Sequence, residues 1–473
     1  SQPVLDRRFM SQRIYFLGIG GTLMGSLAQL AKSQGFTVSG SDSAIYPPMS
    51  DLLEDAQIQV FDHFDPRQLI PVPDQIVIGN AGQQRDNPAI EYILDNGLNY
   101  VSGAEWLGTH VLRERWVMAV SGTHGKTTTA SMLSWIFTAN HKDPGFLIGG
   151  SPNNFNQSAR VGSDPFFIVE ADEYDTSFFD RRSKFVHYRP KTLIINNIEY
   201  DHADIFPSIQ AIQEQFHLLV RSVPSNGLII KPEDDQNISE VLKAGCWTPI
   251  QNVTTTQSHT RSRSKGHEPY WTSTGTGSDF KVYEKGELAG QVQWPLIGEH
   301  NRLNAMSAIA AAKHGGITAA DACNALCAFE GVKRRLDIIY QSGNVTIYDD
   351  FAHHPTAILK TLDAIRSNSP SDRIVAVIEP RTHTMSLGAL KSDLVSCNRS
   401  ADQTYWFKGD NINWDLEQIA RETPTPSTVF SDLEQLVNQI QADAASSLAT
   451  HIVIMSNGAF GGIYKKLVDR LPP

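Results

Sequence analysis

The chain contains 473 residues, of which 41% are hydrophobic and 19% are charged, and its formal net charge is −11. This length predicts about three domains rather than a single core. The acidic balance disfavours nucleic acid and anionic membranes as partners, and no segment reaches the roughly eighteen apolar residues of a membrane span. The N-terminal residues lack the apolar stretch of a secretory signal, so we expect a cytoplasmic protein, monomeric or weakly homo-oligomeric. Four cysteines without a CxxC pair favour neither a disulfide framework nor a zinc site.

The first predicted unit is a strand, a glycine-rich turn, a helix and a second strand. The apolar residues 13–17 precede Gly18-Ile19-Gly20-Gly21, and the second strand ends at Ser41-Asp42. An acid roughly twenty residues beyond such glycines is typical of a dinucleotide-binding unit. Leu23 occupies the third glycine position of that fingerprint, so the match is incomplete. A further strand leads into Gly79-Asn80-Ala81, where another turn is expected.

A second glycine-rich turn follows the buried strand predicted at residues 116–121. It is Gly122-Thr123-His124-Gly125-Lys126-Thr127-Thr128, and it leads into an apolar helix. Such glycines let backbone N–H groups point at an anion, and the helix dipole adds to the attraction. Lys126 is placed to contact β- and γ-phosphates, and Thr127 is placed to hold Mg²⁺. Val120 stands where the general nucleotide-binding loop has a glycine, yet the pattern still predicts ATP binding.

Two neighbouring apolar runs end in polar side chains. Residues 166–169 lead into Glu170-Ala171-Asp172-Glu173, and residues 192–195 lead toward Asp201-His202. The carboxyl ends of parallel strands meet at one sheet edge, so Glu170 and His202 are expected beside Lys126. Carboxylates suit Mg²⁺, and a histidine is compatible with a second metal that bridges nucleotide and substrate.

The remaining sequence organises the C-terminal half. Residues 251–277 are rich in Thr, Ser and Gly and predict a mobile surface excursion, whereas residues 331–335 predict a hinge. Strands and helices alternate beyond that hinge, which predicts a third α/β domain. We therefore expect domains at residues 1–115, 116–331 and 332–473.

These patterns alone leave several classes open. A phosphate loop serves kinases, transporter ATPases and ligases, the first unit could belong to an oxidoreductase, and an ATP-driven scaffold would need no second substrate. The second nucleotide loop and Leu23 disfavour the oxidoreductase.

Five motifs in order resemble the Mur ligase family, ATP-dependent enzymes that join amino acids or peptides to UDP-N-acetylmuramate. They are GTHGKTTT, EADEYD, the Asn197 to His202 stretch, GEHNRLNA at 298–305 and DDFAHHP at 349–355. The resemblance spans nearly the whole chain and accounts for the loop, because this family uses G-T-x-G-K-[ST]. It implies an α/β fold of three domains: a Rossmann-like N-terminal domain, a central P-loop ATPase domain and a Rossmann-like C-terminal domain.

The resemblance also implies a mechanism in which ATP phosphorylates the lactyl carboxylate of UDP-N-acetylmuramate and an amine then attacks the acyl phosphate. It assigns catalytic roles to Lys126, Glu170, His202 and His124. His124 is left between a contact with the substrate carboxylate and a contact with a metal. The implied nucleotide-binding residues are Gly122, Thr123, Gly125, Lys126, Thr127, Thr128, His300, Asn301, Asn304, Arg335 and Asp350. Mg²⁺ ligation is implied for Thr127, Glu170 and His202. Arg335 has an alternative role as an interdomain salt bridge.

The same resemblance divides the substrates between the outer domains. The uridine diphosphate part is expected at Gly18, Gly20, Gly21, Ser41, Asp42, Asn80 and Ala81, and no nicotinamide is expected. Arg381 is the best candidate to grip a peptide carboxylate, because a guanidinium binds it bidentately, and Asn457 is a second candidate.

Two amine substrates are compatible with these motifs. The stretches at 46–50, 102–107, 178–185, 379–381 and 455–462 resemble the ligases of peptidoglycan recycling, which attach the murein tripeptide L-alanyl-γ-D-glutamyl-meso-diaminopimelate. We therefore expect the tripeptide, with free L-alanine as the alternative. Residues 203–220 contain no lysine, so a carbamylated lysine ligand is not predicted, and Gln215 or water is expected in its place.

Overall fold

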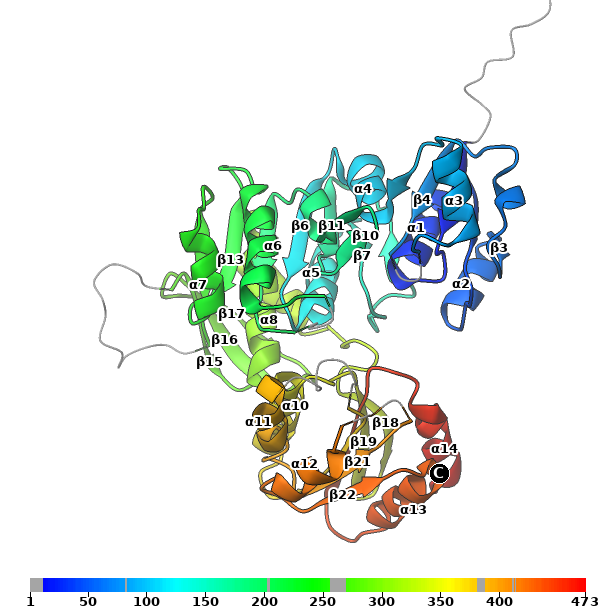
Figure 1. Ribbon diagram of the computed structural model, residues 1–473. Helices are drawn as coiled ribbons and strands as arrows, with labels where there is room; N and C mark the ends of the chain where they lie inside the picture. The colour runs from blue at the N-terminus through cyan, green and yellow to red at the C-terminus, as the bar shows by residue number, and fades with distance from the viewer. Residues whose placement is uncertain are drawn as a thin grey trace, which may run out of the picture.

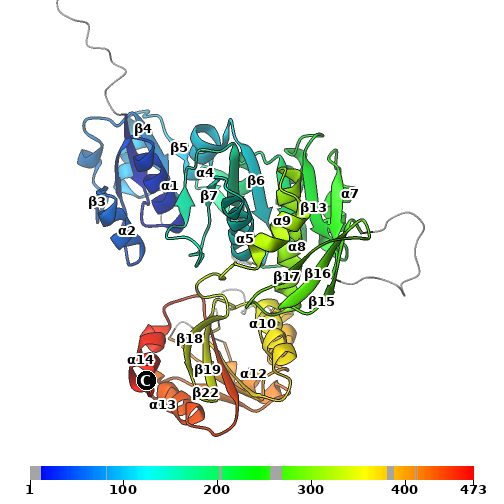
Figure 2. The same cartoon turned by 180° about the vertical axis from the view of Figure 1, so that it is seen from behind.

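The computed structural model describes residues 12–80, 83–201, 205–255, 269–380, 388–410, 412 and 414–473. Three large sheets organise these residues, and each is flanked by helices. The first two sheets lie side by side, and the third lies beneath them (Figure 1), as the view from behind also shows (Figure 2). None of the described helices has the length and apolar character needed to cross a membrane.

The N-terminal sheet has five parallel strands in the order β3-β2-β1-β4-β5. Its strand β1 is buried on both faces, which explains the continuous apolar run in the sequence. The elements are β1 (Arg13–Leu17), α1 (Thr22–Ser33), β2 (Thr37–Ser41), α2 (Met49–Asp55), β3 (Gln59–Phe61), β4 (Gln75–Ile78), α3 (Pro88–Asp95), β5 (Val101–Ser102) and α4 (Gly103–Leu107).

The central sheet has ten strands, and β6 lies inside it between β12 and β9. Its first part comprises β6 (Trp116–Ser121), α5 (Lys126–Ala139), β7 (Gly145–Leu147), β8 (Ala159–Arg160), β9 (Phe166–Glu170), β12 (Thr192–Ile195), α6 (Ile209–Arg221), β13 (Leu228–Pro232) and α7 (Gln236–Lys243). Its second part comprises β14 (Ile250–Val253), β15 (Trp271–Gly275), β16 (Asp279–Glu284), β17 (Glu287–Gln293), α8 (Glu299–His314) and α9 (Ala319–Leu326). Because β6, β9 and β12 are parallel neighbours, their carboxyl ends meet at one edge.

The excursion predicted at residues 251–277 is wrong at the two ends of that segment. Strands β14 and β15 occupy parts of this segment and pair at Val253 and Trp271. Trp271 is fully buried, and its indole N–H donates to Gln251 Oε1 at 2.9 Å. Burial of an aromatic side chain outweighs the loop-like composition around it. Residues 256–268 lie outside the described residues.

The C-terminal sheet has six strands in the order β18-β19-β23-β20-β21-β22, and only its edge strand β18 is antiparallel to its neighbour among these described pairings. The elements are β18 (Asp337–Ser342), β19 (Val345–Asp350), α10 (Pro355–Asn368), β20 (Arg373–Ile378), α11 (Gly388–Ser396), β21 (Gln403–Phe407), α12 (Leu416–Glu422), β22 (Ser427–Phe430), α13 (Leu433–Ala444), β23 (Thr450–Met455) and α14 (Ile463–Arg470).

A small hairpin, β10 (Asp175–Ser177) and β11 (Asp180–Ser183), connects the first two sheets. Asn80 Nδ2 donates to the Asp175 carbonyl at 3.0 Å and to its carboxylate at 2.8 Å. Ser177 Oγ donates to the Gly79 carbonyl at 3.1 Å. Gln215 Oε1 accepts from the backbone N–H of Ser183 at 2.8 Å. The predicted substrate residue Asn80 thus lies at the junction of two sheets, and Gln215 supports the hairpin.

The segment predicted as a hinge is bonded to the sheets on both sides. Lys333 N donates to the Ser151 carbonyl at 3.0 Å, on the central side. Arg334 Nη2 donates to the carbonyls of Ser456 and Gly458 at 3.0 and 2.9 Å, on the C-terminal side. Arg334 also has a left-handed backbone with φ of 62°. These contacts fix the direction in which the chain enters the third sheet.

Candidate active site

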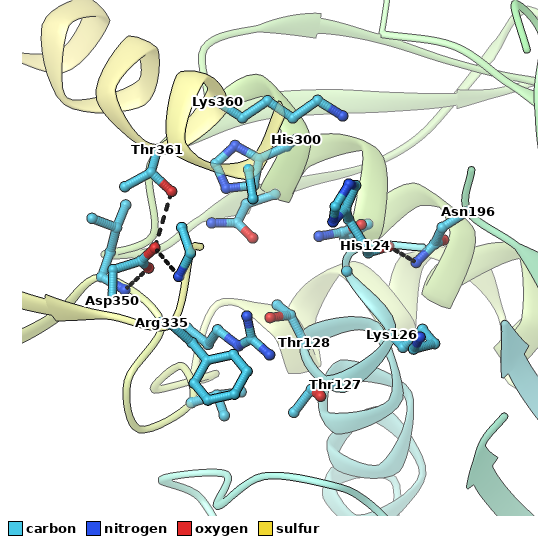
Figure 3. Close-up of a pocket in the computed structure, with 18 of the residues that line it drawn as sticks. His124, Lys126, Thr127, Thr128, Asn196, His300, Arg335, Asp350, Lys360 and Thr361 are labelled. Carbon is cyan, nitrogen blue, oxygen red and sulfur yellow. Dashed lines mark hydrogen bonds between the residues drawn. The ribbon is translucent and has the colours of Figure 1, made fainter. Parts of the chain in front are cut away.

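A cavity of about 1150 Å³ lies where the phosphate loop, α8 and the third sheet meet. Its lining includes most of the nucleotide-binding residues predicted from sequence: Thr123, Gly125, Lys126, Thr127, Thr128, His300, Asn301, Asn304, Arg335 and Asp350. His124 and Glu170 line it as well. Figure 3 shows how His124, His300 and Arg335, among the labelled residues, reach the cavity from different elements. The structure therefore brings together residues that span more than two hundred positions of sequence.

The loop between β6 and α5 has a backbone that only glycine adopts easily at two positions. Gly122 and Gly125 have φ of 133° and 81°, in the range that favours glycine. A Cβ atom on Gly125 would also lie 2.8 Å from Asn304 Oδ1. Helix α5 starts without a side-chain cap, so its positive end faces the cavity. This arrangement suits a phosphate group.

Asn197 holds this loop in shape and was not predicted as a site residue. Its carbonyl accepts from Thr123 N at 3.1 Å, and its Oδ1 accepts from His124 N at 2.8 Å. Its Nδ2 donates in turn to the His124 carbonyl at 3.2 Å. The sequence signal was the polar pair Asn196-Asn197 directly after the buried strand β12, a position that faces the same sheet edge as the loop.

Lys126 is paired with a carboxylate that was also not predicted as a site residue. Its Nζ lies 3.0 Å from Glu173 Oε2, and both side chains are largely buried. Burial lowers the pKa of Lys126, but Glu173, Asp172 and Glu170 outweigh it and raise the pKa above its usual value. The ammonium group therefore remains charged at neutral pH and offers its charge to a phosphate.

Thr127 and Glu170 form a compact oxygen pair at the start of α5. Thr127 Oγ1 donates to Glu170 Oε1 at 2.9 Å, and Gly149 N donates to Glu170 Oε2 at 2.6 Å. A hydroxyl and a carboxylate at this position are the donors that Mg²⁺ takes at phosphate loops. The residues present thus fit a magnesium ion.

The third sheet supplies the opposite wall of the cavity. Arg335 is exposed to the cavity and lies over the Phe351 ring at 4.8 Å, pointing toward Thr127 and Thr128 (Figure 3). Desolvation lowers the pKa of its guanidinium, although Asp350 and Glu170 act in the opposite direction. Asp350 of the third sheet and Glu170 of the central sheet both act on Arg335, so the γ-phosphate contact and the interdomain electrostatic role both stay predictions.

Asp350 already uses its carboxylate within the protein. It accepts from Leu336 N at 2.8 Å, from Ala352 N at 3.1 Å and from Thr361 Oγ1 at 3.1 Å. Desolvation raises its pKa. In this arrangement Asp350 fixes the start of the third domain, and a ribose hydroxyl would have to share its oxygens.

Residues of α8 form the side of the cavity next to the loop. Asn301 Nδ2 donates to the Ile297 carbonyl at 3.0 Å, so this amide is partly used inside the helix. Desolvation and the charge of Lys360 lower the pKa of His300 to about 4. His300 is therefore neutral at physiological pH and presents a flat, uncharged ring to the cavity.

The N-terminal candidates lie apart from this cavity, at the carboxyl edge of the first sheet. Gly20 N donates to Asp42 Oδ2 at 2.9 Å, and Gly21 precedes α1. Gly18 N donates to the Ser41 carbonyl at 2.8 Å. Ser41 is fully buried and its hydroxyl accepts from Tyr15, so its side chain faces the core rather than a ligand. The pleat turns the Ser41 side chain inward, so a contact of Ser41 with the uridine diphosphate stays a prediction that its backbone at the turn would have to make.

Other predicted residues have less structural support. His202, Ala81 and Arg381 lie outside the described residues. Asn457 is half-buried and follows β23, beside Ser456, whose hydroxyl donates to Glu379 Oε1 at 2.6 Å. The loop that carries Asn457 therefore meets the end of β20 at the carboxyl edge of the third sheet.

The fold is a three-domain α/β architecture, and a cavity lined by the phosphate loop lies between its central and third sheets. Family models match residues 13–115 (Mur ligase family, catalytic domain), 120–312 (Mur ligase middle domain) and 334–458 (Mur ligase, glutamate ligase domain). The chain belongs to the Mur ligase family and is an ATP-dependent ligase. The expected fold class is thereby confirmed.

Individual relatives extend over almost the whole chain. The chain is 46% identical over 464 residues to the UDP-N-acetylmuramate–L-alanyl-γ-D-glutamyl-meso-2,6-diaminoheptandioate ligase of Haemophilus influenzae, covering 97% of this chain and 99% of the relative. The enzyme of the same name from Escherichia coli is 48% identical over 463 residues. The match covers 97% of this chain and 98% of the relative. A UDP-N-acetylmuramate–L-alanine ligase of Clostridium acetobutylicum is 34% identical, and the match covers 80% of this chain and 79% of that ligase. The crystal structure of a murein peptide ligase from Psychrobacter arcticus is 39% identical, with a TM-score of 0.72 over 98% of this chain and 100% of that chain.

Proposed function

We propose that this chain joins L-alanyl-γ-D-glutamyl-meso-diaminopimelate to UDP-N-acetylmuramate with ATP, in peptidoglycan recycling. One observation carries the choice of peptide: relatives named for this reaction share nearly half of their residues with the chain along almost its full length. The L-alanine ligase is less similar and matches a smaller part of the chain. Free L-alanine is therefore the second candidate substrate.

In this proposal each of the three domains binds a different substrate. Residues 1–115 bind the uridine diphosphate part through the turn after β1, together with Asp42 and Asn80. Residues 116–331 bind ATP around the phosphate loop, and residues 332–473 bind the tripeptide. The carboxyl edges of all three sheets carry the relevant loops, which supports this division because ligands of α/β sheets bind there.

The first chemical step brings together two anions, the γ-phosphate and the lactyl carboxylate. Lys126 and the amino end of α5 offset this charge from the loop, and Arg335 offsets it from the opposite wall. The adenine lies against His300 and Asn304 on α8. Thr127 and Glu170 hold Mg²⁺, which supplies further positive charge at the phosphate oxygens when it is bound. A second magnesium position at His202 belongs to the same proposal.

The second step is the attack of the peptide amine on the acyl phosphate. His124 extends from the loop toward the third sheet, and Glu199 Oε2 holds its Nε2 at 3.2 Å. This position supports a contact of His124 with the reacting carboxylate. Arg381 and Asn457 are the proposed contacts for the carboxylates of the tripeptide, since both follow strands at the carboxyl edge of the third sheet.

Substrate competition tests the proposal directly. The purified enzyme receives UDP-N-acetylmuramate, ATP and Mg²⁺ with either the tripeptide or free L-alanine, and phosphate release and the coupled product are measured. We expect kcat/KM to favour the tripeptide by at least about a hundredfold, because its extra carboxylates add contacts that L-alanine lacks. A preference for L-alanine would instead establish the second candidate.

A further inference from the structure

Three side chains from separate parts of the chain meet beside the phosphate loop. His124 belongs to that loop, Glu199 follows β12, and His354 immediately precedes α10 of the third sheet. His124 Nε2 lies 3.2 Å from Glu199 Oε2, and His354 Nδ1 lies 3.9 Å from the same oxygen. One ligand atom of each residue lies within 4.8 Å of the other two, a grouping that is the sole one of its kind across the described part of the chain.

The charge states of Glu199 and His354 suit a cation. Desolvation raises the pKa of Glu199, but hydrogen bonds from His124 and Thr356 and the nearby imidazoles bring it down to about 2. Glu199 is therefore ionised at neutral pH. Burial lowers the pKa of His354, so its imidazole is neutral and keeps a lone pair.

His354 is also incompletely satisfied by the protein. The residue is 5% exposed, and its Nε2 has no hydrogen-bond partner within the described residues. Its Nδ1, the atom that lies 3.9 Å from Glu199 Oε2, accepts a long 3.3 Å bond from Thr356 N at the start of α10, and coordination through Nδ1 would replace that bond. A buried imidazole with one weak hydrogen bond gains more from a ligand than a fully bonded one does.

The spacing matches tetrahedral coordination. Metal–ligand bonds of about 2.0–2.2 Å place neighbouring ligand atoms roughly 3.4 Å apart in a tetrahedron. The two measured separations from Glu199 Oε2, 3.2 and 3.9 Å, bracket that value. The third pair, His124 and His354, has ligand atoms within 4.8 Å of each other.

We propose that His124, Glu199 and His354 form a binding site for Zn²⁺ or a similar transition-metal ion, with a fourth position open to water or to a substrate oxygen. Two imidazoles and one carboxylate favour Zn²⁺ over Mg²⁺, which prefers oxygen ligands and octahedral geometry. This site differs from the oxygen pair of Thr127 and Glu170, and it contains no cysteine. The cysteine spacing that was examined in the sequence therefore does not reveal this site.

A metal at this position connects the central and third sheets. His354 belongs to the third domain, at the start of α10, and His124 belongs to the phosphate loop of the central domain. An ion bound to both would hold the two domains at a fixed separation. A metal bound to His124 also prevents this side chain from contacting the reacting carboxylate. Zn²⁺ therefore inhibits turnover at concentrations far below those of Mg²⁺, because the enzyme cycle requires the cleft to open and close.

Direct metal binding is the decisive experiment. Co²⁺ is added to the full-length protein without nucleotide or substrate, and the visible absorption of tetrahedral Co²⁺ is recorded, followed by displacement with Zn²⁺. The variants are Glu199→Gln and His354→Asn, since asparagine retains an acceptor for the start of α10. The matched control is His353→Asn, which alters the adjacent histidine whose Nδ1 lies 3.0 Å from the Phe351 carbonyl.

We expect one Co²⁺ per chain for the wild type and for the control, and at least about tenfold weaker binding for both ligand variants. Circular dichroism and thermal unfolding verify that the variants are folded. Equal binding by all variants would place the ion elsewhere, and an absence of stoichiometric binding by the wild type would also overturn the proposal. Because this readout needs no turnover, it is independent of the proposed ligase reaction.

Inhibition provides the second readout. At saturating Mg²⁺, micromolar Zn²⁺ is added to the wild type and to His353→Asn, and the residual activity of His354→Asn is compared with both. We expect the concentration for half inhibition to rise at least about tenfold in His354→Asn. An unchanged value would show that inhibition arises from another position.

Discussion

Two strand–glycine–helix turns in this molecule share a backbone design and differ in chemistry. The first, between β1 and α1, and the second, between β6 and α5, each contain a glycine with positive φ, and each helix starts without a side-chain cap. In the first turn, Asp42 accepts the N–H of Gly20, and the sequence from 18 to 25 has no basic residue. In the second, Lys126 and the Thr127–Glu170 pair stand at the helix start.

This difference teaches that a glycine turn alone does not define its ligand. Both turns expose the positive end of a helix, which attracts an anion. Only the second adds a buried ammonium group and an oxygen pair fitted to Mg²⁺, as phosphoryl transfer requires. The first turn has a carboxylate, Asp42, which would repel a phosphoryl group in transfer but accepts hydroxyl donors, as the proposed binding of a sugar nucleotide requires. The following predictions test that separation.

The largest effect is expected for Lys126→Ala. Removal of the ammonium leaves the phosphoryl group without a buried cation, so ATP-dependent phosphate release with UDP-N-acetylmuramate falls roughly a thousandfold or more. Thermal unfolding serves as the control for folding. Phosphate release near the wild-type rate would break the assignment of chemistry to the second turn.

The second-largest effect is expected for one of two matched glycine substitutions, one in each turn. Gly125→Ala places a methyl group 2.8 Å from Asn304 Oδ1 at a left-handed backbone position, whereas Gly21→Ala meets nothing nearer than the Gly18 carbonyl at 3.6 Å. Gly125→Ala should destabilise the protein by about 1–2 kcal/mol and weaken ATP binding. Gly21→Ala should change the free energy of unfolding by less than about 0.5 kcal/mol. Denaturant unfolding and ATP calorimetry measure both, and equal costs would contradict the comparison.

A moderate and selective effect is expected for Asp42→Ala. Loss of the carboxylate releases the N–H of Gly20 and removes an acceptor at the first turn. The KM for UDP-N-acetylmuramate should rise about tenfold, the equivalent of about 1.4 kcal/mol, while the KM for ATP stays unchanged. Steady-state kinetics with each substrate varied in turn provide the measurement. A rise in the KM for ATP alone would reverse the roles of the two turns.

The smallest effect is expected for Glu173→Gln. Lys126 Nζ donates to Glu173 Oε2 at 3.0 Å, so this carboxylate competes with a phosphate oxygen for the ammonium group. The neutral amide of glutamine competes less with the phosphate oxygens for Lys126. The buried ammonium group of Lys126 also loses its paired charge, so it is less stable until ATP binds. ATP should therefore bind a few fold more tightly, and its stabilisation against heating should exceed that of the wild type. A weaker effect of ATP on the melting temperature would show that Glu173 assists binding instead.

Sequence reasoning was most successful where chemistry is local. Lys126, Thr127 and Glu170 follow buried strands by short, regular intervals, so their convergence could be predicted from parallel-sheet topology. It was less successful for Trp271, whose burial belongs to a strand in a segment of loop-like composition. It also missed Glu173 and Glu199, because a run of carboxylates does not reveal which member faces a lysine or a histidine.

By itself, the sequence determined the family, the use of ATP and the loop that binds it, since these depend on residue types at fixed short spacings. Only the tertiary structure decided which distant groups share the cavity. Arg335 is the last residue of the hinge and His354 lies beyond it, and their distance from the loop depends on the backbone at Arg334 and on the bonds that fix it. Those contacts arise from packing between domains, and no spacing along the chain encodes them.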